Sequence, residues 1–180
     1  VYVDLAAQTA LDGYGTTDLL AGIEHARGST FDDSLFGGAG ANTLEGGLGD
    51  DWLAGGAGND TLDGGGGTDV AFYMTAATAI TVDLAAGTAT DGLGGSDVLT
   101  DIEGALGNDG ADLFIGNDAG NFFGGGGGND TLTGGEGTDW ALFGGNSVGV
   151  DVDLGGGTAN QGNGDVDTLQ SIEGVFGSSH

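Results

Sequence analysis

The sequence predicts an all-β fold in which short parallel strands stack into a solenoid. Three observations support this prediction. A nine-residue pattern repeats in phase along much of the chain, glycine supplies 44 of the 180 residues, and large apolar residues return at one fixed position of the repeat. A solenoid explains all three, because each repeat is a turn and a strand that bury their apolar face only by stacking on neighbours.

A longer repeat organises the chain. The segment VDLAAQTALDGYGTTDLLAGIE begins at Val3, and similar segments begin at Val82 and Val152, so the spacings are 79 and 70 residues. The difference is one nonapeptide. We expect one continuous β-solenoid fragment over residues 1–180, with long units 1–79, 80–149 and a truncated 150–180. Because Val1 is not a usual start, we also expect the chain to belong to a longer protein.

The nonapeptides form two blocks. Residues 28–72 hold five copies (for example GGAGNDTLD), residues 107–142 hold four, and a third block opens at Gly177 as GSSH. Glycine permits tight turns with positive φ, so each copy parses as a six-residue turn followed by a three-residue strand. Two copies make an eighteen-residue coil. Stacked coils give two parallel sheets, with the eighth-position leucines and phenylalanines between them.

Charge restricts the function. The chain has 28 acidic residues, the single cation Arg27 and no lysine, for a net charge of -27, which argues against nucleic acid or an anionic membrane as partner. No apolar run is long enough to insert into a membrane. There is no cysteine and the histidines are His25 and His180, so neither zinc-type sites nor a nucleophilic triad is expected. Carboxylates and carbonyls instead favour calcium, which would also neutralise the charge.

The sixth position of each nonapeptide is Asp or Asn, preceded by glycines. Stacking places the acids of repeats n and n+2 side by side on one edge, which gives about five candidate calcium sites, weaker at Asn42 and Asn121 because the amide lacks a charge. The alternative is that these side chains only cap turns. The candidate ligand residues are Asp33, Asn42, Asp51, Asp60, Asp69, Asp112, Asn121, Asp130 and Asp139, with turn glycines Gly38, Gly40, Gly47, Gly49, Gly56, Gly58, Gly65, Gly67, Gly126, Gly128, Gly135 and Gly137.

The segments GGAGNDTLD and GGGGNDTLT resemble the hemolysin-type calcium-binding nonapeptide of repeats-in-toxin (RTX) proteins, G-G-x-G-x-D-x-U-x. The resemblance implies a right-handed parallel β-roll that folds with calcium. It also implies type I export from a Gram-negative bacterium, hence a secreted, extracellular or cell-surface location.

The function expected is a non-catalytic, calcium-stabilised extracellular rod, part of a surface, matrix or filament-forming protein. The alternative is a calcium-triggered folding and export module attached to a secreted enzyme or toxin. Partners would be calcium and further copies of the chain, end to end or side by side. Trp52, Phe122 and Trp140 are expected to face outward, either covering neighbouring coils or contacting another copy.

The spacers at 1–27, 73–106 and 143–176 are expected to continue the solenoid with two strands and a turn each. Because the blocks hold five and four copies, we expect consecutive spacers to leave from opposite edges. Acids recur in phase in the spacers, either as solvated strand-edge charge or as further calcium ligands: Asp18, Glu24, Asp97, Glu103, Asp167 and Glu173.

Overall fold

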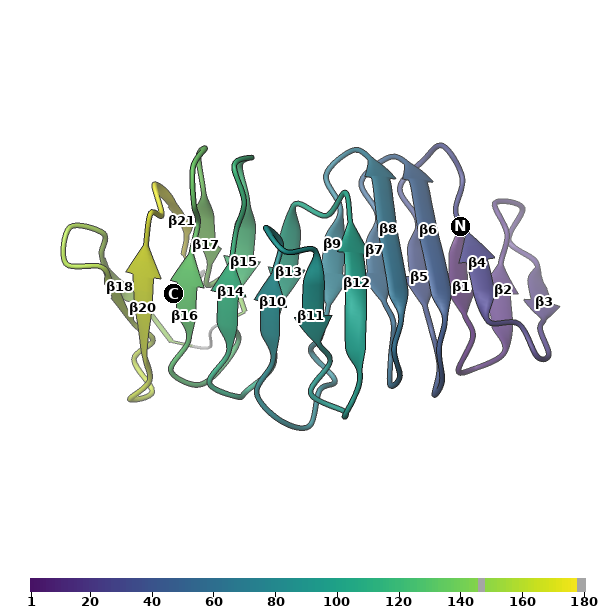
Figure 1. Ribbon diagram of the computed structural model, residues 1–180, viewed down its shortest axis with the longest axis horizontal. Helices are drawn as coiled ribbons and strands as arrows, with labels where there is room; N and C mark the ends of the chain where they lie inside the picture. Colours follow the sequence, from purple (N-terminus) through teal and green to yellow (C-terminus); the bar gives the residue numbers. More distant parts are fainter. Residues whose placement is uncertain (146–147, 178–180) are drawn as a thin grey trace.

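The computed structural model describes residues 1–145 and 148–177 and contains two β-sheets that face each other along the molecule (Figure 1). One sheet has ten strands, in the spatial order β21 (Gly174–Phe176), β17 (Trp140–Leu142), β15 (Phe122–Gly124), β13 (Gly104–Leu106), β9 (Val70–Phe72), β7 (Trp52–Ala54), β5 (Ser34–Phe36), β1 (Tyr2–Asp4), β2 (Thr9–Leu11) and β3 (Thr17–Leu19).

The other sheet has eleven strands, in the order β18 (Asp151–Asp153), β19 (Thr158–Asn160), β20 (Val166–Gln170), β16 (Thr131–Thr133), β14 (Leu113–Ile115), β10 (Thr81–Asp83), β11 (Thr88–Thr90), β12 (Ser96–Thr100), β8 (Thr61–Gly66), β6 (Thr43–Leu48) and β4 (His25–Arg27). Within the described ranges, the search for a helix that could cross a membrane finds no such segment.

Within the blocks, successive nonapeptides alternate between the sheets. Each strand pairs in parallel with the strand of the repeat eighteen residues on, as Leu35 with Leu53 and Leu44 with Leu62. The second block keeps this register, with Phe114 opposite Leu132. The predicted class, an all-β roll of two largely parallel short-stranded sheets, is confirmed.

The core lies between the sheets and is built from the eighth position of the repeats. Leu35, Leu44, Leu53, Leu62 and Phe114 are fully buried. Burying such a side chain contributes about 1.5–3 kcal/mol. A three-residue strand has only one such inward side chain, so the roll depends on stacking many coils.

The spacers contain more strand than expected. In the second spacer β10, β11 and β12 form an antiparallel meander in the eleven-stranded sheet, and β13 then joins the other sheet. The third spacer repeats this plan with β18, β19, β20 and β21. Of the four strands in the second spacer, the sequence did not predict two: β13 and the middle strand of the meander, β11. Ala89 of β11 is buried between the exposed Thr88 and Thr90, an alternation too short to recognise beside glycine.

The expectation that consecutive spacers leave from opposite edges is wrong. Both blocks end in the ten-stranded sheet, at β9 and β17, and both following spacers begin in the eleven-stranded sheet. The reason is β13, which stacks on β9 and makes the second block start on the opposite sheet from the first. The second block therefore starts in the eleven-stranded sheet, and its four copies end, like the five copies of the first block, in the ten-stranded sheet.

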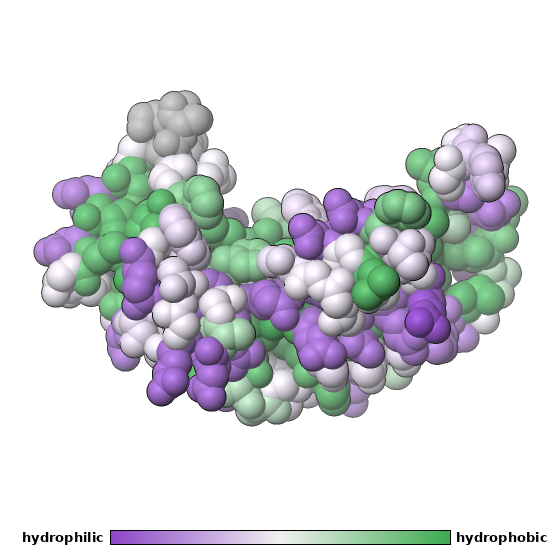
Figure 2. Space-filling model, turned by 90° about the horizontal axis from the view of Figure 1, so that it is seen from above, coloured by the Kyte–Doolittle hydropathy of each residue, from purple (hydrophilic) through white to green (hydrophobic). Residues whose placement is uncertain are grey.

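Of the three seventh-position aromatic residues, Trp52 and Trp140 face outward as expected, whereas Phe122 is half-buried. Trp52 and Trp140 are 47% and 37% exposed. Each packs on an aromatic ring of a neighbouring coil, with centroid distances of 5.2 Å from Trp52 to Phe72 and 4.8 Å from Trp140 to Phe176. These contacts favour the interpretation that they cover neighbouring coils. Seen from above, the molecule is hollowed between two protruding ends, and hydrophilic and hydrophobic residues are interspersed over this face (Figure 2).

Candidate calcium sites

The nine sixth-position residues each directly precede a strand and are all buried, with exposures between 0% and 7%. Strand alternation divides them between two edges. Asp33, Asp51, Asp69, Asn121 and Asp139 precede strands of the ten-stranded sheet, and Asn42, Asp60, Asp112 and Asp130 precede strands of the other. The structure therefore brings together the residues that the repeat spacing paired.

The paired residues are joined by a ladder of hydrogen bonds. The backbone N–H of Asp33 donates to Oδ1 of Asp51, and that of Asp51 donates to Oδ1 of Asp69, each at 2.8 Å. The three other predicted pairs make the same bond at 2.7–2.9 Å: Asn42 to Asp60, Asp112 to Asp130, and Asn121 to Asp139. Each later acid thus uses one oxygen to hold the preceding coil.

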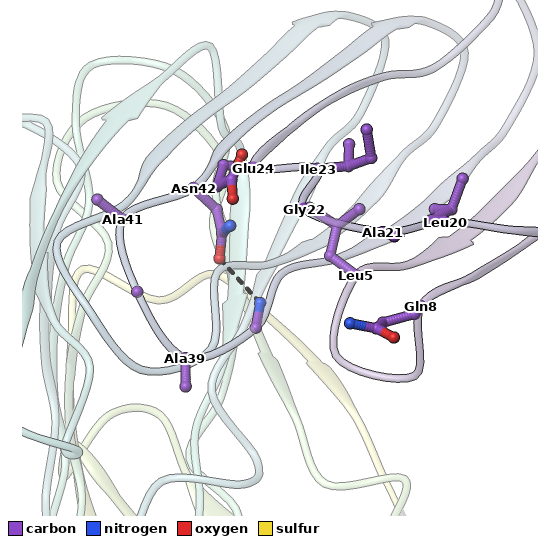
Figure 3. Close-up of a pocket in the computed structure, with 12 residues that line it drawn as sticks. Leu5, Gln8, Leu20, Ala21, Gly22, Ile23, Glu24, Ala39, Ala41 and Asn42 are labelled. Atoms are coloured by element: carbon purple, nitrogen blue, oxygen red, sulfur yellow. Dashed lines mark hydrogen bonds between the residues drawn. The ribbon is translucent and has the colours of Figure 1, made fainter.

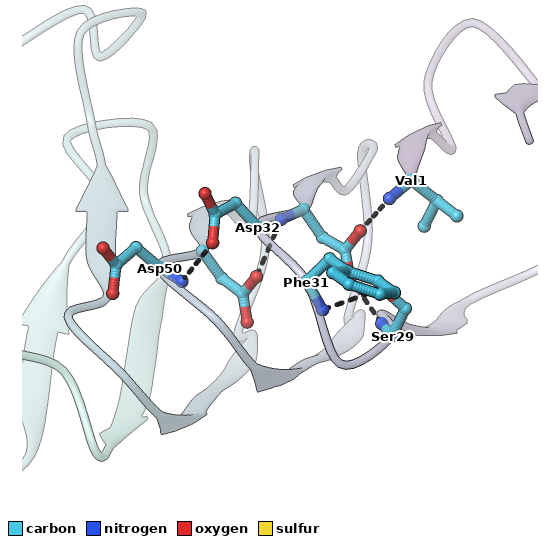
Figure 4. Close-up of polar contacts among 7 residues, drawn as sticks. Val1, Ser29, Phe31, Asp32 and Asp50 are labelled. Atoms are coloured by element: carbon cyan, nitrogen blue, oxygen red, sulfur yellow. Dashed lines mark hydrogen bonds and ion pairs between the residues drawn. The ribbon is translucent and has the colours of Figure 1, made fainter. Parts of the chain in front are cut away.

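Turn capping accounts for the first acid on each edge of each block. Oδ1 of Asn42 accepts the N–H of Gly38 at 2.8 Å, within its own turn (Figure 3). Asp112 and Asn121 accept the same bond from Asn108 and Asn117, and Asp33 accepts it from Ser29. The other oxygen of Asp33, Oδ1, is buried without a hydrogen-bond partner among the described residues and forms an ion pair with the α-ammonium group of Val1 (Figure 4). Beside it, the exposed N–H of Asp50 donates to Oδ1 of Asp32.

Turn capping does not account for the remaining five. Their Oδ2 atoms are buried and have no hydrogen-bond partner among the described residues: Asp51, Asp60, Asp69, Asp130 and Asp139. A buried, unpaired carboxylate oxygen is costly and calls for an explanation such as a bound ion.

The pKa values of these five carboxyl groups also show that positive charge is missing around them. Burial raises the pKa of Asp51 and of Asp69 to about 6, and that of Asp130 to about 7. For Asp60 and Asp139 burial is also the main cause of a raised pKa. Neighbouring carboxylates add repulsion at each of the five positions. The folded chain without a cation therefore disfavours the charges that its sequence carries.

Backbone carbonyl oxygens lie close to the Oδ2 atoms of the sixth-position acids. A Cβ on Gly46, the first glycine of its repeat, would lie 2.2 Å from Oδ2 of Asp51 and 2.6 Å from the carbonyl oxygen of Gly64 in the next coil. A Cβ on Gly28 or Gly107 would likewise meet its own repeat's acid and the next coil's carbonyl. Each such point is bordered by a carboxylate and a carbonyl, which are the ligand types that calcium takes.

No group of three His, Cys, Asp or Glu side chains that could hold a metal gathers anywhere in residues 1–145 and 148–177. A site built here must therefore take most of its ligands from the backbone. That donor set excludes a zinc-type site and fits a hard cation that accepts many carbonyl oxygens. These residues fit calcium.

The turn glycines named from sequence shape the turns. All of them except Gly38 have positive φ, for example 115° at Gly47 and 148° at Gly67. Sequence reasoning did not name the first-position glycines, yet they border the acids. The glycine doublet that opens most copies is the sequence feature that marks them.

The spacer acids fall into three kinds. Asp97 and Asp167 are 1% exposed, so they are not solvated strand-edge charges. Glu103 and Glu173 accept backbone hydrogen bonds from the last acids of the preceding blocks. Asp18 and Glu24 are exposed at the first coil.

A family model described as RTX calcium-binding nonapeptide repeat (4 copies) matches residues 20–53, 36–71 and 106–141. No curated protein matches the chain at a significant level. The matched segments cover both nonapeptide blocks and end before the spacer acids that follow each block.

Proposed function

Because the chain contains RTX calcium-binding nonapeptide repeats, we propose that it is a calcium-folded structural module, an extracellular rod within a surface, matrix or filament-forming protein. The residues that would hold calcium are the nine sixth-position side chains, with carbonyls of the glycine turns. About five ions would be held within the blocks. Bound calcium would supply the positive charge that the chain lacks.

The observation that carries this proposal is the set of five buried Oδ2 atoms without partners. They lie along both edges of the roll, so the requirement for a cation is distributed over both blocks. Arg27 is the only cationic side chain of Lys or Arg type, against 28 acidic residues. Without bound cations, self-repulsion opposes the compact state.

The rod interpretation is supported by the pairing of spacers and blocks within the same two sheets. On this proposal, long units 1–79, 80–149 and 150–180 form one continuous solenoid, to which further copies add end to end or side by side. The last three residues of the third unit lie outside the described residues. RTX repeats are typical of secreted bacterial proteins, which supports a secreted or cell-surface location, and type I export from a Gram-negative bacterium is part of the proposal.

We assign no catalytic role to this segment. Internal His25 is exposed and contacts Glu45 at 3.2 Å, and the buried carboxylates are committed to the ladder and to cation binding. The second candidate is a calcium-triggered folding and export module attached to a secreted enzyme or toxin. The same calcium sites would serve this second function. A catalytic domain elsewhere in the parent protein would favour it over the structural rod.

Far-UV circular dichroism tests the proposal. The chain should be mostly coil in chelator and gain β-structure in millimolar calcium, the range for extracellular modules. Magnesium at the same concentration is the control, because it demands a smaller octahedral shell. Equal β-content in chelator and calcium would refute calcium-dependent folding.

A further inference from the structure

The coil that follows the last acid of each block comes from a spacer. Strand β13 pairs in parallel with β9, and β21 pairs in parallel with β17. Asp69 and Asp139 directly precede β9 and β17, so each faces a spacer coil where an inner acid faces another nonapeptide. The family match stops at residues 71 and 141, and neither spacer coil carries the glycine-rich signature.

The spacer coil nevertheless presents a carbonyl at the same place as a repeat does. A Cβ on Gly64 would lie 2.1 Å from the carbonyl oxygen of Asp101 and 2.6 Å from Oδ2 of Asp69. A Cβ on Gly134 would lie 2.1 Å from the carbonyl oxygen of Ser171 and 2.3 Å from Oδ2 of Asp139. These distances match the arrangement around Gly46 inside the block.

The backbone that aims these carbonyls is strained. Asp101 and Ser171 both have φ of 49°, a left-handed conformation that is unfavourable for a residue other than glycine. The first spacer has Gly22 at the equivalent position, with φ of 60°. The side chains of Asp101 and Ser171 differ. The two junctions therefore share the backbone conformation, which sets the direction of the carbonyl.

A glutamate takes the place of the sixth-position acid. Oε2 of Glu103 accepts the N–H of Asp69 at 2.8 Å, and Oε2 of Glu173 accepts that of Asp139 at 2.9 Å. This is the bond that each later aspartate makes inside a block. The oxygens facing onward, Oδ2 of Asp69 and of Asp139, are buried and have no partner among the described residues.

The other edge closes differently. Oδ1 of Asp97 accepts the N–H of Asp60, and Oδ2 accepts the hydroxyl of Tyr73. Asp167 accepts the N–H of Asp130 and the side-chain amide of Gln161. Both oxygens of Asp97 and of Asp167 are thus hydrogen-bonded to protein groups, so these spacer residues offer no unpaired oxygen to the calcium that Oδ2 of Asp60 and of Asp130 would bind.

We propose that the two block–spacer junctions on the ten-stranded edge are calcium sites that groups of the spacers complete. One is formed by Asp69, the carbonyl of Asp101 and Glu103, and the other by Asp139, the carbonyl of Ser171 and Glu173. The proposal rests on calcium binding by the blocks and assigns two of their five unpaired Oδ2 atoms, those of Asp69 and Asp139, to sites that include spacer groups. Calcium at these positions would fasten each spacer to the block before it.

The test is a count of bound calcium after equilibrium dialysis at a free concentration that just saturates the wild-type chain. Glu103→Gln and Glu173→Gln keep an oxygen that accepts the backbone N–H and remove only the charge. Each should lose about one ion per chain, and the double variant about two, while far-UV circular dichroism reports whether the chain still folds. Asp97→Asn and Asp167→Asn are the matched controls, because they remove one charge from the equivalent ladder position on the other edge.

Loss of ions in the glutamine variants alone supports the junction sites. An unchanged count in the glutamine variants, or an equal loss in the asparagine controls, overturns them. A wild-type chain that gains no β-structure with calcium would instead refute calcium-dependent folding itself. The two proposals therefore fail by different measurements.

Discussion

The hydroxyl of Tyr73 donates a 2.9 Å hydrogen bond to Oδ2 of the buried Asp97. Seventy residues on, phenylalanine stands at position 143 in place of tyrosine, and Asp167 instead accepts a 2.8 Å bond from Nε2 of Gln161. The first junction has Asp91 where the second has Gln161. Two junctions of the same fold thus satisfy the same buried carboxylate with donors from different positions.

Replacing Tyr73 with Phe should therefore lower the free energy of unfolding of the calcium-loaded chain by about 1.5–3 kcal/mol, since it removes a hydrogen bond to a buried charged group. Urea denaturation monitored by circular dichroism measures the change. Tyr14→Phe is the control, because Tyr14 is 94% exposed. Equal effects of the two changes would show that the contact with Asp97 contributes nothing.

Asn42 and Asp60 are neighbours on one edge and differ in charge. Asp60→Asn should raise the calcium concentration at the folding midpoint, because it removes a carboxylate whose Oδ2 is buried without a partner. Asn42→Asp should lower that midpoint, because it adds a charge to the oxygen-lined turn. Calcium titrations followed by circular dichroism compare the two. Shifts in the same direction would contradict the charge argument.

Gly46→Ala should destabilise the roll by at least about 2 kcal/mol, because the added methyl would overlap Oδ2 of Asp51 and the carbonyl of Gly64. It should also reduce calcium binding at that turn. Gly13→Ala is the control, since a Cβ at Gly13 meets nothing within 4 Å and its φ is not positive. A calcium-loaded Gly46→Ala chain as stable as Gly13→Ala would disprove the close approach.

Acid should partly replace calcium. The pKa of Asp51 and of Asp69 is raised to about 6 and that of Asp130 to about 7, from 3.8, so the folded calcium-free chain binds more protons than the unfolded one. Its stability therefore rises as pH falls from 7 toward 5 and is lost as pH rises through these values.

The measurement is circular dichroism of the dialysed, calcium-free chain between pH 7 and pH 5, with sedimentation to show that it stays monodisperse. More β-structure is expected at the lower pH. The calcium-saturated chain is the control and should change little over this range. A fall in the β-content of the calcium-free chain on acidification would contradict the prediction that proton binding stabilises the folded state.

The sequence alone determined the repeat, the buried position and the paired acids. Leu44, Leu62 and Asp60 could be placed because a nine-residue period fixes which residue points inward and which precedes each strand. Stacking then requires acids eighteen residues apart to be neighbours. These features can be predicted from residue type and period alone, because within a block each nonapeptide strand pairs with the one eighteen residues away.

Only the tertiary structure decided what happens between the blocks. The meander around Ala89, the return of both blocks to the same sheet and the use of Glu103 in place of an aspartate depend on which coil stacks on which. The spacer carries no nonapeptide signature, so the coil on which it stacks cannot be derived from its own residues. Asp69 has the same local sequence role as Asp51, and only the coil stacked against it shows that its free oxygen faces the carbonyl of Asp101.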